Sequence, residues 1–181
     1  MFTLMNLVAT PHLKVVTQLC KDPMREYYQR ELAIVSKVSV GLTNQFLREL
    51  TELQFVTQEK RGKMNFYKLN LKNPVVRQFK ILLNVDSLHE LIQTISTGSR
   101  KVILFGSTSQ GTDAKESDVD LFILTSEKDW VRRKISEFNS RSKRKIAPII
   151  VDANGFVKLK RDDKPLYENI GSGIILWQTT E

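Results

Sequence analysis

The stretch Phe105–Leu124, FGSTSQGTDAKESDVDLFIL, contains the pattern from which the fold of the second half of the chain can be predicted. An apolar run ends at Phe105 and is followed at once by Gly106-Ser107, and another apolar run follows Asp118-Val119-Asp120. Short apolar runs bounded by glycine and polar residues are typical of buried strands. The stretch therefore predicts a strand, a turn-length helical segment that closes at Gly111, and a second strand.

The spacing of the two aspartates indicates what this strand pair can hold. Residues two apart on a strand project from one face, so we expect Asp118 and Asp120 to project together, with Cα atoms about 7 Å apart. Two carboxylates on one face are an unfavourable pair unless a cation lies between them, and Mg²⁺ suits them when substrate phosphates complete its shell. Gly106 lets a phosphate approach the backbone, Ser107 adds a hydroxyl, and the following helical turn offers N–H groups. Each element alone also fits a plain solvated strand edge, but together they predict a site for magnesium and a triphosphate.

The order of strand, Gly106-Ser107, loop and Ser117-Asp118-Val119-Asp120-Leu121 resembles the nucleotidyltransferase superfamily that includes DNA polymerase β and kanamycin nucleotidyltransferase. The resemblance spans about residues 98–177. It implies a mixed-sheet fold and transfer of a nucleoside monophosphate from ATP or another NTP, with Mg²⁺ as cofactor and pyrophosphate as leaving group. It also implies that Asp118 and Asp120 are catalytic metal ligands and that Gly106 and Ser107 bind the nucleotide.

The loop Gly106–Gly111, GSTSQG, departs from this family in its charge. Minimal members usually carry two arginines here, and both are missing. Positive charge for the triphosphate must then come from Arg100, Lys101, Lys115 or the basic cluster that begins at Arg132.

A third carboxylate, which the family uses as metal ligand and often as base, is also missing from its expected strand. The predicted strand Lys145–Val151 contains no acidic residue. Asp152 follows this strand, and two interpretations of it remain open. It is either displaced into the site as the third catalytic acid, or it caps the predicted helix Ala153–Lys160. Without a third carboxylate we expect a slow enzyme, or a domain that only binds nucleotide or a partner.

The first half of the chain predicts three helices followed by a β-hairpin. Thr10-Pro11 is a helix start before Pro11–Lys21, and two further helical patterns lie on either side of Ser39–Gly41. Two β-prone runs, Phe55–Thr57 and Asn65–Leu69, then flank a glycine at the position of a hairpin tip. This order is similar to that of a winged helix-turn-helix over about residues 10–70.

The helix from Leu42 to Leu53 would be the recognition helix of such a module. Polar side chains off its apolar stripe can contact base edges of duplex DNA, namely Thr43, Asn44, Gln45 and Arg48. Arg61 and Lys63 at the hairpin tip would reach phosphates or the minor groove. The alternative is a module that only dimerises or holds a partner protein.

The composition is that of a folded protein, with 41% hydrophobic and 27% charged residues and a net charge of +8. Basic residues gather between Lys60 and Lys80 and between Arg132 and Lys145, which suits a polyanionic partner. We find no signal-peptide pattern, no apolar run of roughly 20 residues and a single cysteine, Cys20. We therefore expect a cytoplasmic protein that does not enter the membrane.

These features predict a two-domain protein of the α/β (α+β) class. We expect a winged helix-turn-helix DNA-binding domain over residues 1–72, a helical connector over 73–97 and a mixed-sheet nucleotidyltransferase domain over 98–181. The protein could also form a homodimer through the helical connector.

We expect transfer of a nucleoside monophosphate to a protein or nucleic-acid acceptor. The resemblance to minimal transferases implies an antitoxin-like regulator of transcription with a toxin-like protein acceptor. Two alternatives remain open. One is a catalytically inactive transcriptional regulator whose second domain binds nucleotide or a partner protein, and the other is nucleotide addition to an RNA end.

Overall fold

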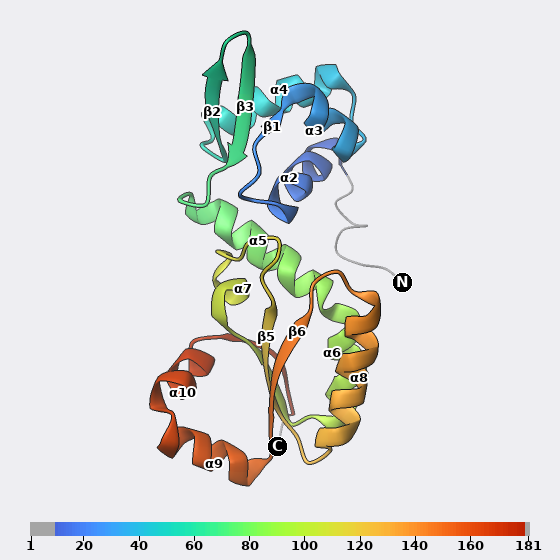
Figure 1. Ribbon diagram of the computed structural model, residues 1–181, viewed down its shortest axis with the longest axis vertical. Coiled ribbons are helices and arrows are strands. Elements are labelled where there is room, and N and C mark those ends of the chain that lie inside the picture. The colour runs from blue at the N-terminus through green and yellow to red at the C-terminus, as the bar shows by residue number, and fades with distance from the viewer. Residues whose placement is uncertain (1–9, 180–181) are drawn as a thin grey trace. The chain divides into compact units, whose positions relative to one another are not determined.

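The computed structural model describes residues 10–179, so residues 1–9 and 180–181 of the predicted domains lie outside the described chain. Two compact units divide between Asp86 and Ser87 (Figure 1). This boundary falls within the segment 73–97 that the sequence assigns to a helical connector. None of the helices in residues 10–179 combines the length and the apolar character needed to cross a membrane.

The N-terminal unit combines helices with a small antiparallel sheet. Its elements are α2 (Pro11–Lys21), β1 (Tyr27–Tyr28), α3 (Gln29–Ser36), α4 (Val40–Glu52), β2 (Val56–Arg61), β3 (Met64–Leu69) and α5 (Pro74–Ser87). The sheet order is β1-β3-β2. This order of helices and strands is that of a winged helix-turn-helix, with the β2–β3 hairpin as the wing.

Local sequence signals explain where the helices of this unit begin. The Thr10 hydroxyl accepts a hydrogen bond from the Leu13 N–H at the start of α2, and the Ser39 hydroxyl accepts one from the Leu42 N–H at the start of α4. The predicted start at Thr10-Pro11 is confirmed. Gly62, with φ of +61°, opens the two-residue hairpin turn, where a positive φ is required. Strand β1 was not predicted from the sequence, because its pairing with β3 is a long-range contact of only two residues.

The C-terminal unit is built around a four-stranded mixed sheet. Its elements are α6 (His89–Ile95), the 3₁₀ turn η1 (Ser96–Gly98), β4 (Lys101–Leu104), α7 (Gly106–Gln110), β5 (Val119–Leu124), α8 (Lys128–Arg141), β6 (Ile146–Val151), α9 (Ala153–Asp162), α10 (Lys164–Gly171) and β7 (Ile174–Gln178). The sheet order is β6-β5-β4-β7, with β5 and β6 parallel and the other pairs antiparallel. The predicted fold class is therefore confirmed for both units.

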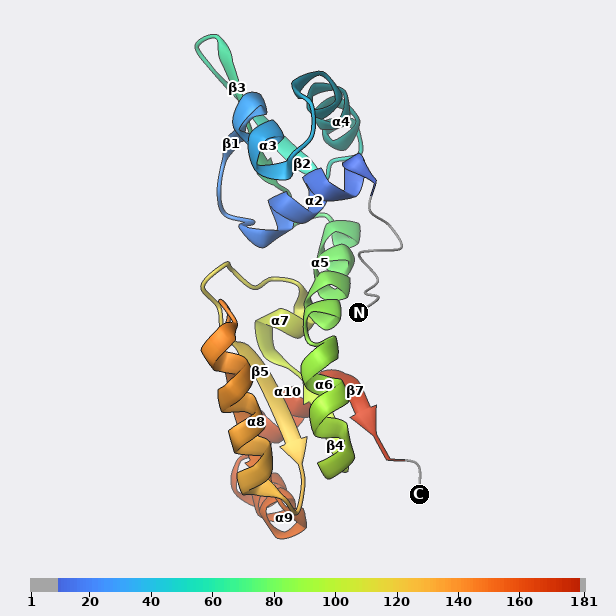
Figure 2. The ribbon, with the colours of Figure 1, turned by 90° about the vertical axis from the view of Figure 1, so that its right-hand side faces the viewer.

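Helices cover both faces of this sheet. Figures 1 and 2 show α6 and α8 on one face and α9 and α10 on the other. Phe122 of β5 packs against Phe156 of α9 with ring centroids 5.6 Å apart, within a cluster that also includes Ile103 and Ile170. Because side chains alternate along a strand, Asp120 lies on this same α9–α10 face, at the end where β5 begins.

Gly173 permits the close approach of the α10–β7 connection to β4. A Cβ atom at Gly173 would lie 2.4 Å from the Leu104 carbonyl oxygen and 2.7 Å from Ile103 Cγ2. Gly171, two residues earlier, has no neighbouring atom within 4 Å of a Cβ atom in the same construction. The two glycines therefore form a matched pair for testing this packing.

We expect Gly173→Ala to lower the free energy of unfolding of the C-terminal unit by about 1–3 kcal/mol, because the added methyl group forces backbone apart. Gly171→Ala should change it by less than about 0.5 kcal/mol. Urea unfolding followed by tryptophan fluorescence measures this unit alone, since both tryptophans, Trp130 and Trp177, belong to it. Equal midpoints for the two variants would contradict this account.

Candidate active site

The pairing of three strands brings the predicted nucleotide and metal residues to one edge of the sheet. Leu104 pairs with Leu121, and the Phe105 N–H donates to the Asp120 carbonyl oxygen at 3.1 Å, so the turn after β4 lies beside the start of β5. On the other side of β5, Val119 pairs with Ile146 at the start of β6. Gly106, Ser107, Asp118 and Asp120 thus come from neighbouring segments at this edge.

Gly106 is required here by both its backbone conformation and its lack of a side chain. Its φ is +67°, in the left-handed region that favours glycine. A Cβ atom at this position would lie 2.3 Å from Asp120 Oδ2 and 3.2 Å from Asp120 Cγ. The Asp120 carboxylate therefore lies directly against the Gly106 backbone, and any larger residue would displace it.

The two aspartates interact electrostatically. Asp120 is partly buried and Asp118 is exposed. Partial burial, and secondly the negative charge of Asp118, raise the pKa of Asp120 above its ordinary value. A cation beside the pair would offset this unfavourable interaction, so the donor set fits Mg²⁺. No group of three or more His, Cys, Asp or Glu side chains within residues 10–179 could hold a metal, so phosphate oxygens would have to complete the shell.

The short helix α7 is tied to the loop that leads into β5. The Thr108 hydroxyl donates to the Asp118 carbonyl oxygen at 3.3 Å, and the Ser109 hydroxyl donates to the Gly106 carbonyl oxygen at 2.8 Å. Ser107 is partly exposed, and its hydroxyl makes no hydrogen bond to any other described residue. Ser107 can therefore donate to a phosphate without breaking an internal contact.

Arg144 is a site residue that the sequence did not single out. Its guanidinium donates to the Ser117 carbonyl oxygen and to Thr108 Oγ1, both at 3.2 Å, and forms a 3.2 Å ion pair with the buried carboxylate of Asp113. Arg144 thus holds the loop before Asp118 against α7. The sequence signal was its membership in the second basic cluster, which indicated surface charge rather than this internal role.

Asp152 lies at the opposite end of β6 from the aspartate pair. Ala147 is the residue that pairs with Asp120, and Asp152 follows it by five residues, about 16 Å along the strand. The Asp152 carboxylate accepts from the Gly155 N–H at 2.8 Å and from Lys128 Nζ at 2.7 Å. The Lys128 hydrogen bond is the main cause that lowers the pKa of Asp152. The capping interpretation of Asp152 is confirmed, and the structure does not bring this carboxylate to Asp118 and Asp120.

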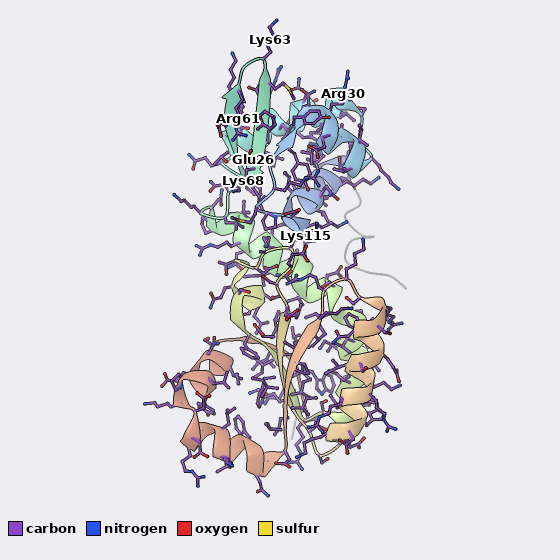
Figure 3. The ribbon with its side chains drawn as sticks, in the orientation of Figure 1. Glu26, Arg30, Arg61, Lys63, Lys68 and Lys115 are labelled. Atoms are coloured by element: carbon purple, nitrogen blue, oxygen red, sulfur yellow. The ribbon has the colours of Figure 1, made fainter. Side chains whose placement is uncertain are left out.

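The basic residues considered as sources of phosphate charge fall into two groups. Lys101 pairs with Leu124, so it and Arg100 lie at the end of β4 and β5 away from Gly106. Lys115, in contrast, lies on the loop between α7 and β5, as Figure 3 shows. This loop and the segment before β6 line a pocket of about 200 Å³ that includes Asp118.

The predicted DNA-contacting residues of α4 are not equally accessible. Thr43 is buried, and its hydroxyl donates to the Ser39 carbonyl oxygen at 2.9 Å, so it belongs to the core rather than to a contact surface. Asn44 is partly exposed, and Gln45 and Arg48 are exposed. Three of the four predicted side chains therefore remain available at the surface.

The two predicted contacts on the hairpin also differ. Arg61 forms ion pairs with Glu26 at 2.7 Å and with Glu59 at 2.6 Å, and these carboxylates raise the pKa of its guanidinium. Lys63 lies at the tip of the hairpin in Figure 3 and forms no ion pair with any described residue. Arg61 belongs to the residue pair next to the turn, but its guanidinium is engaged in these ion pairs, so it is Lys63 that presents the exposed charge at the tip of the hairpin.

The raised pKa of Asp120 predicts how the stability of the C-terminal unit depends on pH. The folded protein binds a proton at Asp120 more readily than the unfolded chain does. Stability from this group is thus present below the ordinary carboxylate pKa of about 4 and is lost as pH rises through the raised value. We expect Asp120→Asn to raise the melting temperature of the C-terminal unit at pH 7 by less than about 4 °C, and the difference to vanish toward pH 3.5.

Tryptophan-fluorescence melts measure this difference, with Glu168→Gln on α10 as an exposed-carboxylate control. Mg²⁺ should raise the melting temperature of the wild type but not of Asp120→Asn, because only the former keeps the aspartate pair. A lower melting temperature for Asp120→Asn at pH 7 would show that the carboxylate stabilises the fold instead.

Comparisons with known proteins agree with the fold of the C-terminal unit. A family model described as "Polymerase beta, Nucleotidyltransferase" matches residues 88–181. No curated protein matches the chain. Among solved structures, the chain is similar to a presumed nucleotidyltransferase from Sulfolobus solfataricus, with 17% identity, a TM-score of 0.35, and coverage of 58% of this chain and 86% of that chain.

The chain is also similar to TrmBL2, an archaeal chromatin protein whose structure shows a novel mode of DNA binding. This match has 18% identity, a TM-score of 0.32, and coverage of 89% of this chain and 69% of that chain. At these TM-scores neither structural similarity bears on the function of this chain. The family model spans more than half of the residues, and on this ground the chain belongs to the polymerase β nucleotidyltransferase family.

Proposed function

We propose that this protein transfers a nucleoside monophosphate from a nucleoside triphosphate to an acceptor hydroxyl, and that its N-terminal unit binds duplex DNA. The observation that carries the first part is the contact between Asp120 Oδ2 and the Gly106 backbone, with Asp118 close enough to raise the pKa of Asp120. This contact places the turn at Gly106, which a phosphate can approach, beside the Asp118–Asp120 carboxylate pair, which a cation would stabilise.

Each residue of this edge has a distinct role in the proposed reaction. Asp118 and Asp120 would hold Mg²⁺ together with phosphate oxygens of the nucleotide. Ser107 would donate its hydroxyl to a phosphate, and Gly106 keeps the backbone and Asp120 in contact. When bound, Mg²⁺ would neutralise the negative charge that the triphosphate carries as its α-phosphorus is attacked.

Ala147 favours a second candidate function. Ala147 lies opposite Asp120 on the neighbouring strand and carries no carboxylate. Asp118 and Asp120 therefore have no acidic neighbour on β6 that could take the acceptor's proton. This predicts slow turnover, or a catalytically inactive transcriptional regulator whose C-terminal unit binds nucleotide or a partner protein. The two functions share the nucleotide site and differ in turnover.

An antitoxin-like regulator is one setting in which both activities would be used. Nucleotide transfer to a toxin-like protein acceptor and DNA binding for autoregulation would then belong to one chain, and a homodimer would suit a palindromic operator. This setting follows from the resemblance to minimal transferases.

The enzymatic proposal predicts different effects for the three aspartates first considered. With α-labelled ATP, Mg²⁺ and candidate protein and nucleic-acid acceptors, Asp118→Ala and Asp120→Ala should each lower label transfer at least about 100-fold, because each removes a metal ligand. Asp152→Ala should lower it less than about threefold, since Asp152 lies at the far end of β6.

Calorimetric titration with Mg²⁺ and ATP supplies the control for binding. Label transfer that is unaffected by loss of Asp118 and Asp120 would contradict the proposed site. Nucleotide binding that depends on these residues without any label transfer would favour the inactive regulator.

The DNA-binding proposal rests on α4 and on the tip of the wing. Asn44, Gln45 and Arg48 present polar groups on α4, and Lys63 presents an unpaired charge beyond the Arg61 ion pairs. In a winged helix, the second helix of the helix-turn-helix enters the major groove while the wing contacts the backbone.

We expect Arg48→Ala and Lys63→Ala each to weaken duplex DNA binding and to reduce the slope of log affinity against log salt by about 0.9, the value for one lost phosphate contact. Lys164→Ala is the matched control, because Lys164 is an exposed lysine of the C-terminal unit. Fluorescence anisotropy over a salt series measures both quantities. Identical slopes for all three variants would exclude this contact surface.

A further inference from the structure

The two aspartates of the candidate site are held in different ways. Asp120 is a residue of β5, where it pairs with Ala147 and its carbonyl oxygen accepts from the Phe105 N–H. Asp118 lies one residue before β5, which begins at Val119. Two carboxylates can share a cation only if both are fixed in direction by the groups around them. The direction of the Asp118 side chain therefore depends on contacts from outside the sheet.

Hydrogen bonds hold the peptide groups on both sides of the Asp118 Cα atom. Before it, the Ser117 carbonyl oxygen accepts from Arg144 Nε at 3.2 Å. After it, the Asp118 carbonyl oxygen accepts from the Thr108 hydroxyl at 3.3 Å. Because each peptide group is planar, fixing the two groups that meet at a Cα atom also fixes the direction of its Cβ atom. These bonds therefore aim the Asp118 side chain.

Arg144 is connected to both of these peptide groups. It bonds to the first directly, and its Nη2 donates at 3.2 Å to Thr108 Oγ1, the hydroxyl that donates to the second. Its Nη1 lies 3.2 Å from the carboxylate of Asp113. All three guanidinium nitrogens are thus engaged, each with a different partner. A planar fork with fixed donor directions suits such a three-way contact.

The segment that carries Arg144 is itself fixed to the sheet and to α8. The Val119 N–H donates to the carbonyl oxygen of Lys145 at 2.9 Å. The Ile146 N–H donates to Asn139 Oδ1, near the end of α8, at 2.7 Å. Arg144 therefore reaches the aspartate loop from a segment with its own backbone contacts.

Burial and charge separate a positioning role for Arg144 from a ligand-binding one. Its side chain is 28% exposed, and both Asp113 and Thr108 are buried. The segment Gly106–Gly111 contains no charged residue, so this guanidinium reaches α7 from another part of the chain. Turning it toward a phosphate would break its contacts with Ser117, Thr108 and Asp113.

We propose that Arg144 positions Asp118 for the metal, by fixing the peptide groups on both sides of Asp118 against α7. This inference rests on the proposed function and adds a positioning residue to that site. Arg144 contacts neither the metal nor the nucleotide in this role. Its effect on nucleotide binding and transfer passes through Asp118.

Two simpler roles for Arg144 lead to different expectations. If it only balanced the buried charge of Asp113, another cation at position 144 would serve equally well. If it only stabilised the fold, its loss would lower the melting temperature without changing how nucleotide binding depends on Mg²⁺. Positioning requires the fork geometry, which lysine lacks.

The test uses the full chain with Arg144→Lys, which keeps the charge and removes the planar fork. Asp113→Asn removes the ion pair and leaves the hydrogen bonds of Arg144 to Ser117 and Thr108 possible. The double variant Arg144→Gln/Asp113→Asn removes the two charges together, which covers the case in which one single change unfolds the unit. Arg161→Lys is the matched control, because Arg161 is exposed on α9.

The quantity measured is the gain in ATP affinity that Mg²⁺ produces, from calorimetry with and without Mg²⁺. All proteins are compared at a temperature at which circular dichroism shows them folded. We expect Arg144→Lys and the double variant each to reduce this gain at least about tenfold, because a displaced Asp118 holds the metal poorly. ATP affinity without Mg²⁺ should stay within about threefold of the wild type, as should the Mg²⁺ gain of Asp113→Asn and Arg161→Lys.

Three results would overturn the inference. An unchanged Mg²⁺ gain in Arg144→Lys would show that charge alone is sufficient. Equal losses in Asp113→Asn and Arg144→Lys would make the ion pair, rather than the two hydrogen bonds, responsible. A loss of ATP affinity of the same size with and without Mg²⁺ would assign Arg144 to the nucleotide or to the fold.

Label transfer supplies a second measurement on the same proteins. Arg144→Lys should lower kcat at least about tenfold and raise the Mg²⁺ concentration needed for half-maximal transfer. The KM for ATP at saturating Mg²⁺ should change less than about threefold. A raised KM with an unchanged kcat would contradict a role that passes through Asp118.

The outcomes separate this inference from the proposed function. If the wild type transfers no label but its Mg²⁺-dependent ATP binding requires the Arg144 fork, the catalytic proposal fails and the positioning role stands. If transfer depends on Asp118 and Asp120 but is unchanged in Arg144→Lys, the catalytic proposal stands and the inference fails.

Discussion

The contact between the Asp120 carboxylate and the Gly106 backbone constrains the candidate site. The Phe105 N–H bond to the Asp120 carbonyl oxygen fixes the register of β4 and β5, and this register directs the Asp120 side chain at the turn. Only a residue without Cβ, in a left-handed conformation, leaves room for the carboxylate. Glycine and aspartate at these positions therefore depend on each other, although they are 14 positions apart in the sequence.

The negative charges of Asp118 and Asp120 at this end of the sheet lower the stability of the folded state. The protein holds Asp120 where burial and Asp118 disfavour its ionised form, which is a cost in the folded state that a bound cation would offset. Elsewhere the chain pairs its charges internally, as Arg61 does with Glu26 and Glu59. The unfavourable charge near Asp120 fits a ligand site, whereas the paired charge of Arg61 fits a structural contact.

Local signals in the sequence were sufficient to predict many helices and strands, but they could not predict the pairing of strands that are far apart in the sequence. The cap at Thr10 and the apolar runs around Gly106 act over a few residues, so α2, β4 and β5 were predictable. Strand β1 depends on a two-residue pairing with β3, and helix α8 was not predicted because two buried residues, Val131 and Ile135, lie among many charged ones. The position of Asp152 relative to the site depends on the register of β6 against β5, which no local pattern encodes.

The site depends on Arg144, a residue that lies outside the Gly-Ser and Asp-Val-Asp pattern of the family. Its guanidinium joins α7, the loop before Asp118 and the segment before β6, and it neutralises the buried carboxylate of Asp113. A single substitution of Arg144 would loosen the aspartate loop while leaving the Gly-Ser and Asp-Val-Asp pattern intact. During divergence, a relative could therefore become inactive without losing any residue of the family signature, and the Arg144–Asp113 pair would be the feature that distinguishes it.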